Sequence, residues 1–278
     1  MSKIEKALRK AEGEGHGRDM LASDSTVEIG VTSSLDEALV DECMVVFHQP
    51  TSVSAEYYKR LRTKIRFENE LRSLKSLLIT SAVSGEGKTT TALNLALALC
   101  QDDDTRVAIV DADLRHPAVH KMLGIDVRAG LSQVLSNGTP LDSAILRTAP
   151  NGLSVLPAGG ALTTATEALG SNTMKDIINE LKSRFDYVVV DGPPVLAVSD
   201  SILLGSIVDG VVLVVQADAT DRKAVSQTIE LLQKSTVIGF VLNRVEPAEL
   251  GRYYGYGYQK YKYRYNHEDA PGGVKADR

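Results

Sequence analysis

Residues 82–89 read Ala-Val-Ser-Gly-Glu-Gly-Lys-Thr, and this stretch decides the fold class. An apolar run at residues 74–80 precedes it, and an Ala- and Leu-rich stretch at residues 88–100 follows; they predict a strand and a helix. A glycine-rich turn in that context lets backbone N–H groups converge on phosphate oxygens, and the helix start adds a favourable partial charge. We therefore expect a phosphate-binding loop in which Lys88 reaches the β- and γ-phosphates and Thr89 binds Mg²⁺.

Short runs of β-branched residues recur along the chain without polar alternation. Such runs are typical of strands buried on both faces, and helical patterns between them indicate parallel, right-handed crossovers. A further helix is expected before the loop, at residues 54–67. The sequence thus predicts an α/β fold of the P-loop NTPase type, a mostly parallel sheet flanked by helices. Besides 74–80, the predicted strands are residues 106–110, 187–190, 211–215 and 237–242.

Two of these strands are followed by carboxylates. Asp111 and Asp113 follow residues 106–110, and Asp191 follows residues 187–190. The carboxyl ends of parallel strands form the edge at which α/β sheets bind ligands. Carboxylates suit Mg²⁺ and can also accept a hydroxyl proton. Each Asp alone could be a helix cap or a turn residue, but together with the loop they indicate one nucleotide site.

The composition excludes several classes of protein. Of the 278 residues, 43% are apolar and 24% are charged, which is ordinary for a globular domain. The net charge of −5, from 31 basic and 36 acidic residues, argues against a surface that grips nucleic acid throughout. Two cysteines, Cys43 and Cys100, are too few for a disulfide framework or an iron–sulfur cluster. No apolar run approaches the ~18 residues of a membrane span, so we expect a cytoplasmic chain without a span or signal peptide.

The chain divides into three predicted regions: an N-terminal helix and linker at residues 1–50, a nucleotide-binding domain at residues 51–250 and a flexible tail at residues 251–278. Residues 2–12 place apolar side chains at helical spacing among basic ones. This short helix could dock on a partner or on an anionic lipid, or it could be a frayed terminus.

The tail is rich in tyrosine and positively charged. Residues 251–265 carry four basic residues and no acidic residue, a net charge of +4. Such a tail is attracted to an acidic site that holds a nucleotide, over roughly 10 Å at 0.1 M salt. Each phosphate would add about −1.5 to −2 charges, so two or three would cancel the attraction. Seven of the ten tyrosines lie there: Tyr253, Tyr254, Tyr256, Tyr258, Tyr261, Tyr263 and Tyr265.

Residues 82–89, 108–115 and 188–194 resemble the Walker A, A′ and B motifs of the bacterial tyrosine kinases, and the resemblance extends over residues 50–265. That family is related to the partitioning and cell-division ATPases and phosphorylates tyrosines in its own C-terminal tails. Residues 1–8 are similar to the start of stand-alone members from exopolysaccharide operons with an exosortase.

The resemblance implies ATP and Mg²⁺ as cofactors and autophosphorylation of the seven tail tyrosines, which we expect to occur in trans. Asp113, or Asp111, would orient and deprotonate the incoming tyrosine. The catalytic residues are then Lys88, Asp111, Asp113 and Asp191; the ATP-binding residues are Ser84, Gly85, Glu86, Gly87, Lys88, Thr89, Thr90, Asn243 and Arg244; the metal-binding residues are Thr89, Asp111 and Asp191.

Two departures from family patterns affect the expected assembly. Partitioning and cell-division ATPases carry an extra lysine that would fall at Val83, and its absence disfavours their nucleotide-sandwich dimer. The tyrosine kinases build ring-shaped oligomers through a Glu-x-x-Arg-x-x-Arg motif, matched here by Glu56, Lys59 and Arg62. Lys59 keeps the charge of the first Arg but lacks its bidentate fork. A charged helix face with i,i+3 pairs is the alternative.

The resemblance also implies a role in exopolysaccharide synthesis or export. A transmembrane polysaccharide chain-length adaptor, an opposing tyrosine phosphatase and a location at the inner face of the plasma membrane belong to this expectation. Asn243 and Arg244 correspond to the family's base-contacting position, with a strand-end cap as the alternative. We expect no nucleic-acid partner. Two other functions would fit the tail: an ATPase whose tail binds single-stranded nucleic acid, and an ATP-dependent scaffold without transfer.

Overall fold

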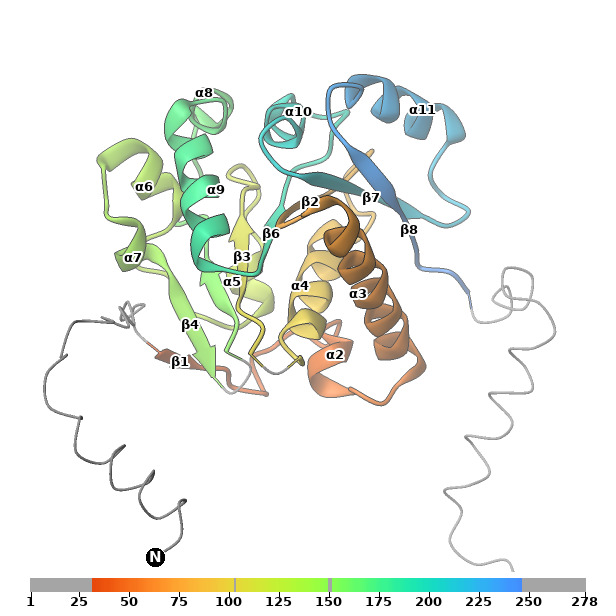
Figure 1. The fold of residues 1–278 in the computed structure, drawn as a ribbon, viewed down its shortest axis with the longest axis horizontal. Coiled ribbons are helices and arrows are strands. Elements are labelled where there is room, and N and C mark those ends of the chain that lie inside the picture. Colours follow the sequence, from red (N-terminus) through yellow and green to blue (C-terminus); the bar gives the residue numbers. More distant parts are fainter. Residues whose placement is uncertain (1–31, 103, 150–151, 247–278) are drawn as a thin grey trace, which may run out of the picture.

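The strand that precedes the glycine-rich loop, β2 (Ser76–Ser81), lies inside an eight-stranded sheet (Figure 1). The computed structural model describes residues 32–102, 104–149 and 152–246. Its other strands are β1 (Thr32–Ser34), β3 (Val107–Asp111), β4 (Leu146–Ala149), β5 (Ser154–Leu156), β6 (Tyr187–Asp191), β7 (Gly210–Gln216) and β8 (Val237–Asn243). Their order across the sheet is β1-β4-β5-β3-β6-β2-β7-β8. Within the described ranges every pairing is parallel except that of β4 with β5.

Helices cover both faces of the sheet, and each layer of helices closes over its own apolar core (Figure 1). One layer consists of α2 (Val45–His48), α3 (Val53–Arg72), α4 (Lys88–Leu99) and α5 (Val119–Met122). The other consists of α6 (Leu131–Asn137), α7 (Leu141–Ala144), α8 (Ala165–Leu169), α9 (Asn172–Arg184), α10 (Asp200–Gly205) and α11 (Arg222–Leu231).

Helix α4 packs against the centre of the sheet and is buried along almost its whole length. Its Ala- and Leu-rich sequence allows it to pack against β2, β3 and β6 on one side and against α3 on the other. Strands β3 and β6 pair in register, so that Asp111 lies opposite Asp191. The fold therefore brings the glycine-rich loop and both carboxylates to the same edge of the sheet.

The predicted α/β fold is confirmed, with one exception about burial. The strands of the sheet centre are buried on both faces, as expected. The last strand, β8, is not, because it lies at the edge of the sheet, where Phe240 and Leu242 are exposed. An apolar run alone does not distinguish an edge strand from a central one.

Three short strands, β1, β4 and β5, were not predicted; they have only three or four residues each. The helix before the loop is also longer at both ends than the predicted residues 54–67. Helix α3 starts after Ser52, whose side chain accepts the N–H of Ala55, and it ends at Arg72, which is followed by Ser73 in the left-handed region, φ 55°. No helix of the described ranges is long and apolar enough to cross a membrane. The N-terminal helix expected at residues 2–12 lies outside the described residues.

A buried asparagine joins the short helix α2 to α4. The Asn94 side chain is fully buried, and its Oδ1 accepts the N–H of Val46 at 3.0 Å. Its amide group donates to the carbonyl oxygens of Cys43 and Thr90, both at 2.9 Å. Asn94 thus satisfies backbone groups of a segment almost 50 residues away.

We predict that Asn94→Ala lowers the free energy of unfolding by about 2–3 kcal/mol, because it leaves the buried N–H of Val46 and the carbonyl oxygen of Cys43 without their partner. Urea-induced unfolding followed by circular dichroism measures the change. Asn137→Ala, at an exposed position of α6, is the matched control and should change stability by no more than about 0.5 kcal/mol. Equal stabilities of the two variants would contradict this role of Asn94.

Candidate active site

The glycine-rich loop has the backbone conformation of an anion-binding site. Gly85 and Gly87 have φ values of 88° and 89°, in the region that favours glycine. A Cβ atom on Gly87 would lie 2.1 Å from Nδ2 of Asn243, so no other residue fits there. In the described part of the chain, the backbone N–H groups of residues 84–90 donate to no protein acceptor. These groups are available for phosphate oxygens at the start of α4.

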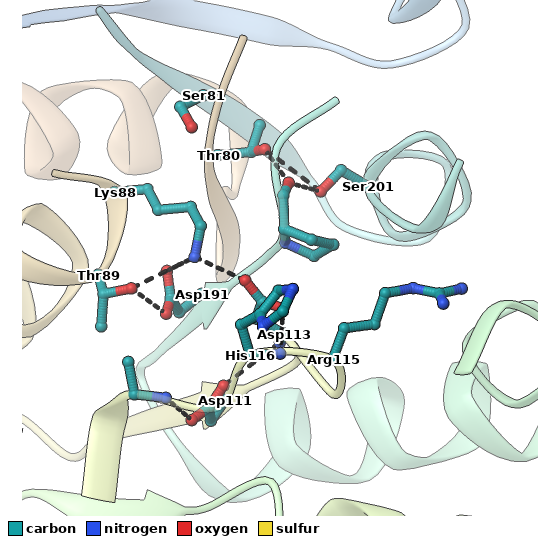
Figure 2. A network of polar contacts seen from close by, with 12 residues as sticks. Thr80, Ser81, Lys88, Thr89, Asp111, Asp113, Arg115, His116, Asp191 and Ser201 are labelled. Carbon is teal, nitrogen blue, oxygen red and sulfur yellow. Dashed lines mark hydrogen bonds and ion pairs between the residues drawn. The ribbon is translucent and has the colours of Figure 1, made fainter. Parts of the chain in front are cut away.

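Lys88 lies between Asp113 and Asp191, and Figure 2 shows its ammonium group directed toward Asp113 and toward the pair of Thr89 and Asp191. Its Nζ is 2.9 Å from Oδ2 of Asp113 and 3.9 Å from Oδ1 of Asp191. Burial disfavours the charged form of Lys88, but the charges of Asp191 and Asp113 outweigh this and hold its pKa above the ordinary value. The loop therefore holds one firmly charged cation, in the position predicted for a phosphate-binding lysine.

Thr89 and Asp191 form the second part of the site. The Thr89 hydroxyl donates to Oδ2 of Asp191 at 2.7 Å (Figure 2). The other oxygen of this carboxylate, Oδ1, is buried and makes no hydrogen bond within the described residues. Burial raises the pKa of Asp191 to about 6, against the lowering effects of Lys88 and Thr89.

The donor set of Thr89 and Asp191 fits Mg²⁺. A hydroxyl oxygen and an unsatisfied carboxylate oxygen are hard ligands, and Mg²⁺ is commonly bound by one or two carboxylates together with substrate phosphates. Nowhere in residues 32–102, 104–149 and 152–246 do three or more His, Cys, Asp or Glu side chains form a group that could hold a metal. The site thus offers part of a coordination shell rather than a complete protein cage.

Asp111 is directed toward the loop that follows β3. Its Oδ2 accepts the N–H groups of Ala118 and Val119, both at 3.1 Å, and its Oδ1 accepts the N–H of Asp113 at 3.3 Å. Burial, aided by the charge of Asp191, raises the pKa of Asp111 to about 7 in spite of these hydrogen bonds. Asp111 therefore shapes the segment that carries Asp113, while Asp113 itself contacts Lys88.

Two side chains outside the predicted site fasten the A′ segment. The Arg115 guanidinium group donates to Oδ2 of Asp200 at 3.0 Å and to the Thr166 hydroxyl at 2.9 Å, and Figure 2 shows it directed away from Lys88. Thr166 in turn donates to the fully buried Asp200 at 2.6 Å. Thr166 and Asp200 were not predicted from the sequence, because they follow no motif; the basic side chain of Arg115 in the A′ stretch is a signal that could have pointed to an acidic partner.

The residues predicted to contact the base lie beside the loop. Asn243 donates through Nδ2 to the Glu86 carbonyl oxygen at 2.9 Å, and Arg244 donates to Oε1 of Gln216 at 3.3 Å. Because the Asn243 amino group binds a carbonyl, its amide oxygen is left to accept a hydrogen bond. An exocyclic amino group, such as that of adenine, is the matching donor.

The predicted interface residues lie on α3. Glu56 and Lys59 pair with each other at 2.6 Å, in the i,i+3 arrangement of an ordinary charged helix face. Arg62 donates to the carbonyl oxygen of Ala98 at 2.9 Å and lies 3.3 Å from Oδ1 of Asp102. The predicted tail tyrosines, residues 253–265, lie outside the described residues.

The fold and this site define a P-loop nucleotide-binding protein, and comparison with known proteins specifies the family. Residues 74–238 match a family model described as an AAA domain. Tyrosine-protein kinase YwqD of Bacillus subtilis is 36% identical over 215 residues, which cover 77% of this chain and 90% of that protein.

Two solved structures are similar over most of the chain. The chimerical protein CapA2B2 matches with a TM-score of 0.69 and 29% identity, over 78% of this chain and 95% of that one. The kinase domain of the Escherichia coli tyrosine kinase ETK matches with a TM-score of 0.67 and 28% identity, over 73% and 82%. The chain belongs to the family of bacterial tyrosine-protein kinases, which confirms the resemblance found in its motifs.

We predict that stability falls as pH rises from about 4 to about 7. Because the pKa of Asp111 is about 7 in the folded protein and 3.8 as its ordinary value, the folded state binds a proton that the unfolded state releases in this window. The raised pKa of Asp191 contributes in the same direction. Asp111→Asn removes the contribution of Asp111, so without Mg²⁺ and nucleotide this variant should lose less stability between pH 4 and pH 8 than the parent does, by about 1–3 kcal/mol. Urea titrations at pH 4 and pH 8 measure this.

Asp126→Asn serves as the control, since Asp126 is exposed, and its stability should follow that of the parent protein at both pH values. An Asp111→Asn variant that loses as much stability between pH 4 and pH 8 as the parent does would refute the assignment.

Proposed function

We propose that this chain is an ATP-dependent protein-tyrosine autokinase that phosphorylates the tyrosine cluster of its own tail. The observation that carries the proposal is the contact between Lys88 and Asp113: a cation that can bind a phosphoryl group lies 2.9 Å from a carboxylate that can accept a proton. Membership of the tyrosine-kinase family agrees with this chemistry.

ATP would bind across residues 84–90, whose N–H groups and helix start favour phosphate oxygens. Lys88 would contact the terminal phosphoryl group and stabilise the charge that develops during transfer. Asn243 would accept a hydrogen bond from the base, since its amino group is already bound to the Glu86 carbonyl.

Asp113 is the proposed acceptor of the tyrosine proton. A phosphoryl group that binds Lys88 competes with Asp113 for the ammonium group, so binding of the nucleotide weakens the ion pair and frees the carboxylate. The phenol oxygen then forms the bond to the terminal phosphorus, the bond to ADP breaks, and the phenolic proton passes to Asp113. Because a free tyrosine has a pKa near 10, a positioned acceptor is required at neutral pH.

Thr89 and Asp191 would hold Mg²⁺, with Asp111 as the third predicted ligand. When bound, the ion supplies charge neutralisation for the phosphates. The unsatisfied Oδ1 of Asp191 supports this assignment. It also explains why a carboxylate with one unbonded oxygen is kept beside Thr89, where burial alone would favour its neutral form.

The basic tail is the proposed substrate, and it would receive the phosphoryl group in trans, in the site of a neighbouring chain. Glu56, Lys59 and Arg62 are the proposed contacts in a ring-like homo-oligomer. The contacts of Arg62 with Ala98 and Asp102 hold it against its own chain and would have to rearrange or be shared. We further propose that the chain regulates exopolysaccharide synthesis or export. It would act at the inner face of the plasma membrane with a transmembrane adaptor and be reversed by a tyrosine phosphatase.

We predict that Lys88→Met lowers tyrosine labelling at least a hundredfold, because it removes the cation that stabilises the transferred phosphoryl group. Intact-mass measurement after incubation with Mg-ATP, with peptide mapping of residues 253–265, gives the result. Lys234→Met, at an exposed position just before β8, is the matched control and should label normally. Retained labelling of Lys88→Met would contradict the role of this lysine, and an unlabelled parent that binds RNA in a salt-sensitive way would favour the nucleic-acid alternative.

We also predict that a Lys88→Met chain becomes phosphorylated when it is mixed with the active chain, because its tail can enter a neighbour's site. A mass tag on the inactive chain distinguishes the two products. Phosphate found only on the active chain would exclude transfer between molecules.

A further inference from the structure

Glu86 is a buried acid inside the phosphate loop, and its side chain is directed into the protein. The residue is 1% exposed. Its Oε2 accepts the N–H of Val83 at 2.9 Å, and its Oε1 accepts the N–H of Gln216 at 3.2 Å and the hydroxyl of Thr220. The carboxylate thus connects the phosphate loop with the end of β7 and with the turn before α11.

Hydrogen bonds alone stabilise this carboxylate in the described part of the chain, where no Lys, Arg or His forms an ion pair with it. Burial of a carboxylate is unfavourable unless its oxygens are well bonded, and here backbone N–H groups and a hydroxyl satisfy both oxygens. Thr220 contributes twice, because its oxygen also accepts the Gln216 N–H at 3.1 Å. A carboxylate held in this way fixes the relative positions of the segments that it joins.

The segments that Glu86 joins include the backbone of the loop that is proposed to bind phosphate. Val83 is held on both sides, by Glu86 at its N–H and by the Ser81 hydroxyl at its carbonyl oxygen, 2.8 Å away. The Glu86 carbonyl oxygen accepts the Asn243 amide, and Gln216 accepts Arg244 through its side chain. The phosphate end and the proposed base end of the site are therefore connected through Glu86.

We propose that Glu86 and Thr220 are positioning residues that set the affinity for a nucleoside triphosphate. They hold the loop so that the N–H groups of residues 84–90 stay available. The Glu86 carboxylate would repel phosphate, and its hydrogen bonds keep it behind the loop. The Glu86 side chain thus acts through the loop, while the backbone N–H of Glu86 stays among the groups available for phosphate. The inference rests on the proposed function only in taking this site to bind a nucleotide.

The test compares Thr220→Val with Thr220→Ser in the full chain. Valine has nearly the shape of threonine but no hydroxyl, whereas serine keeps the hydroxyl. Titration calorimetry with Mg²⁺ and a non-hydrolysable ATP analogue should show affinity about tenfold weaker for Thr220→Val and within twofold of the parent for Thr220→Ser. In tyrosine labelling, the KM for ATP should rise about tenfold for Thr220→Val while kcat stays within twofold.

Glu86→Gln is the second variant, with the exposed Glu230→Gln as its matched control. Its amide group would oppose the Val83 N–H, so a folded Glu86→Gln should bind the analogue at least tenfold more weakly, whereas Glu230→Gln should bind like the parent. If Glu86→Gln does not fold, the Thr220 pair decides the question alone.

Equal analogue affinity of Thr220→Val and the parent would overturn the inference, as would a loss of kcat at unchanged KM. Equal weakening by Thr220→Val and Thr220→Ser would also overturn it, since the hydroxyl would then not be responsible. A parent chain that does not bind the analogue at all would instead contradict the proposed function.

Discussion

The site depends on one largely buried ammonium group that keeps mutually repelling carboxylates together. Lys88 contacts Asp113 and lies near Asp191, whose register partner is Asp111. Burial already favours the neutral forms of Asp111 and Asp191, and each further negative charge strengthens that effect. A triphosphate adds several negative charges at this point. Binding of a triphosphate therefore requires that the ammonium group of Lys88 contact phosphate oxygens as well as carboxylates. It also requires that a divalent cation accompany the nucleotide.

The surroundings of this cation are held rigidly from several directions. Glu86 fastens the loop to β7, Asn243 fastens it to the end of β8, and the carboxylate of Asp111 orders the segment after β3. Arg115 joins that segment to α8 and α10 through the buried Asp200. Preorganisation of this kind contributes to phosphoryl transfer because little reorganisation is left for the reaction itself.

The parts of the site that are local in sequence could be predicted, and those that depend on packing could not. The spacing of glycines and lysine in residues 82–89 was enough to predict a phosphate-binding loop, and the predicted strand before Asp191 indicated that this acid belongs to the site. Thr220 lies 134 residues from Glu86 and belongs to a turn without a motif. The exposure of Phe240 could not be predicted either, because the sequence pattern of a strand does not reveal whether another element covers it. Distant partners and edge positions are decided by topology.

The position of β8 has a geometric consequence for the seven tail tyrosines. Its last residue, Asn243, is bonded to the phosphate loop, and the described chain ends three residues later at Glu246. A fully extended chain spans about 3.3–3.6 Å per residue, so Tyr253 can lie at most roughly 25 Å from Glu246, whereas Tyr265 can lie up to roughly 65 Å from it. The outermost hydroxyls can thus lie much farther from β8 than the innermost ones can. If the tail is the substrate, as proposed, contour length as well as side-chain chemistry limits which tyrosines could enter the site of a neighbouring chain.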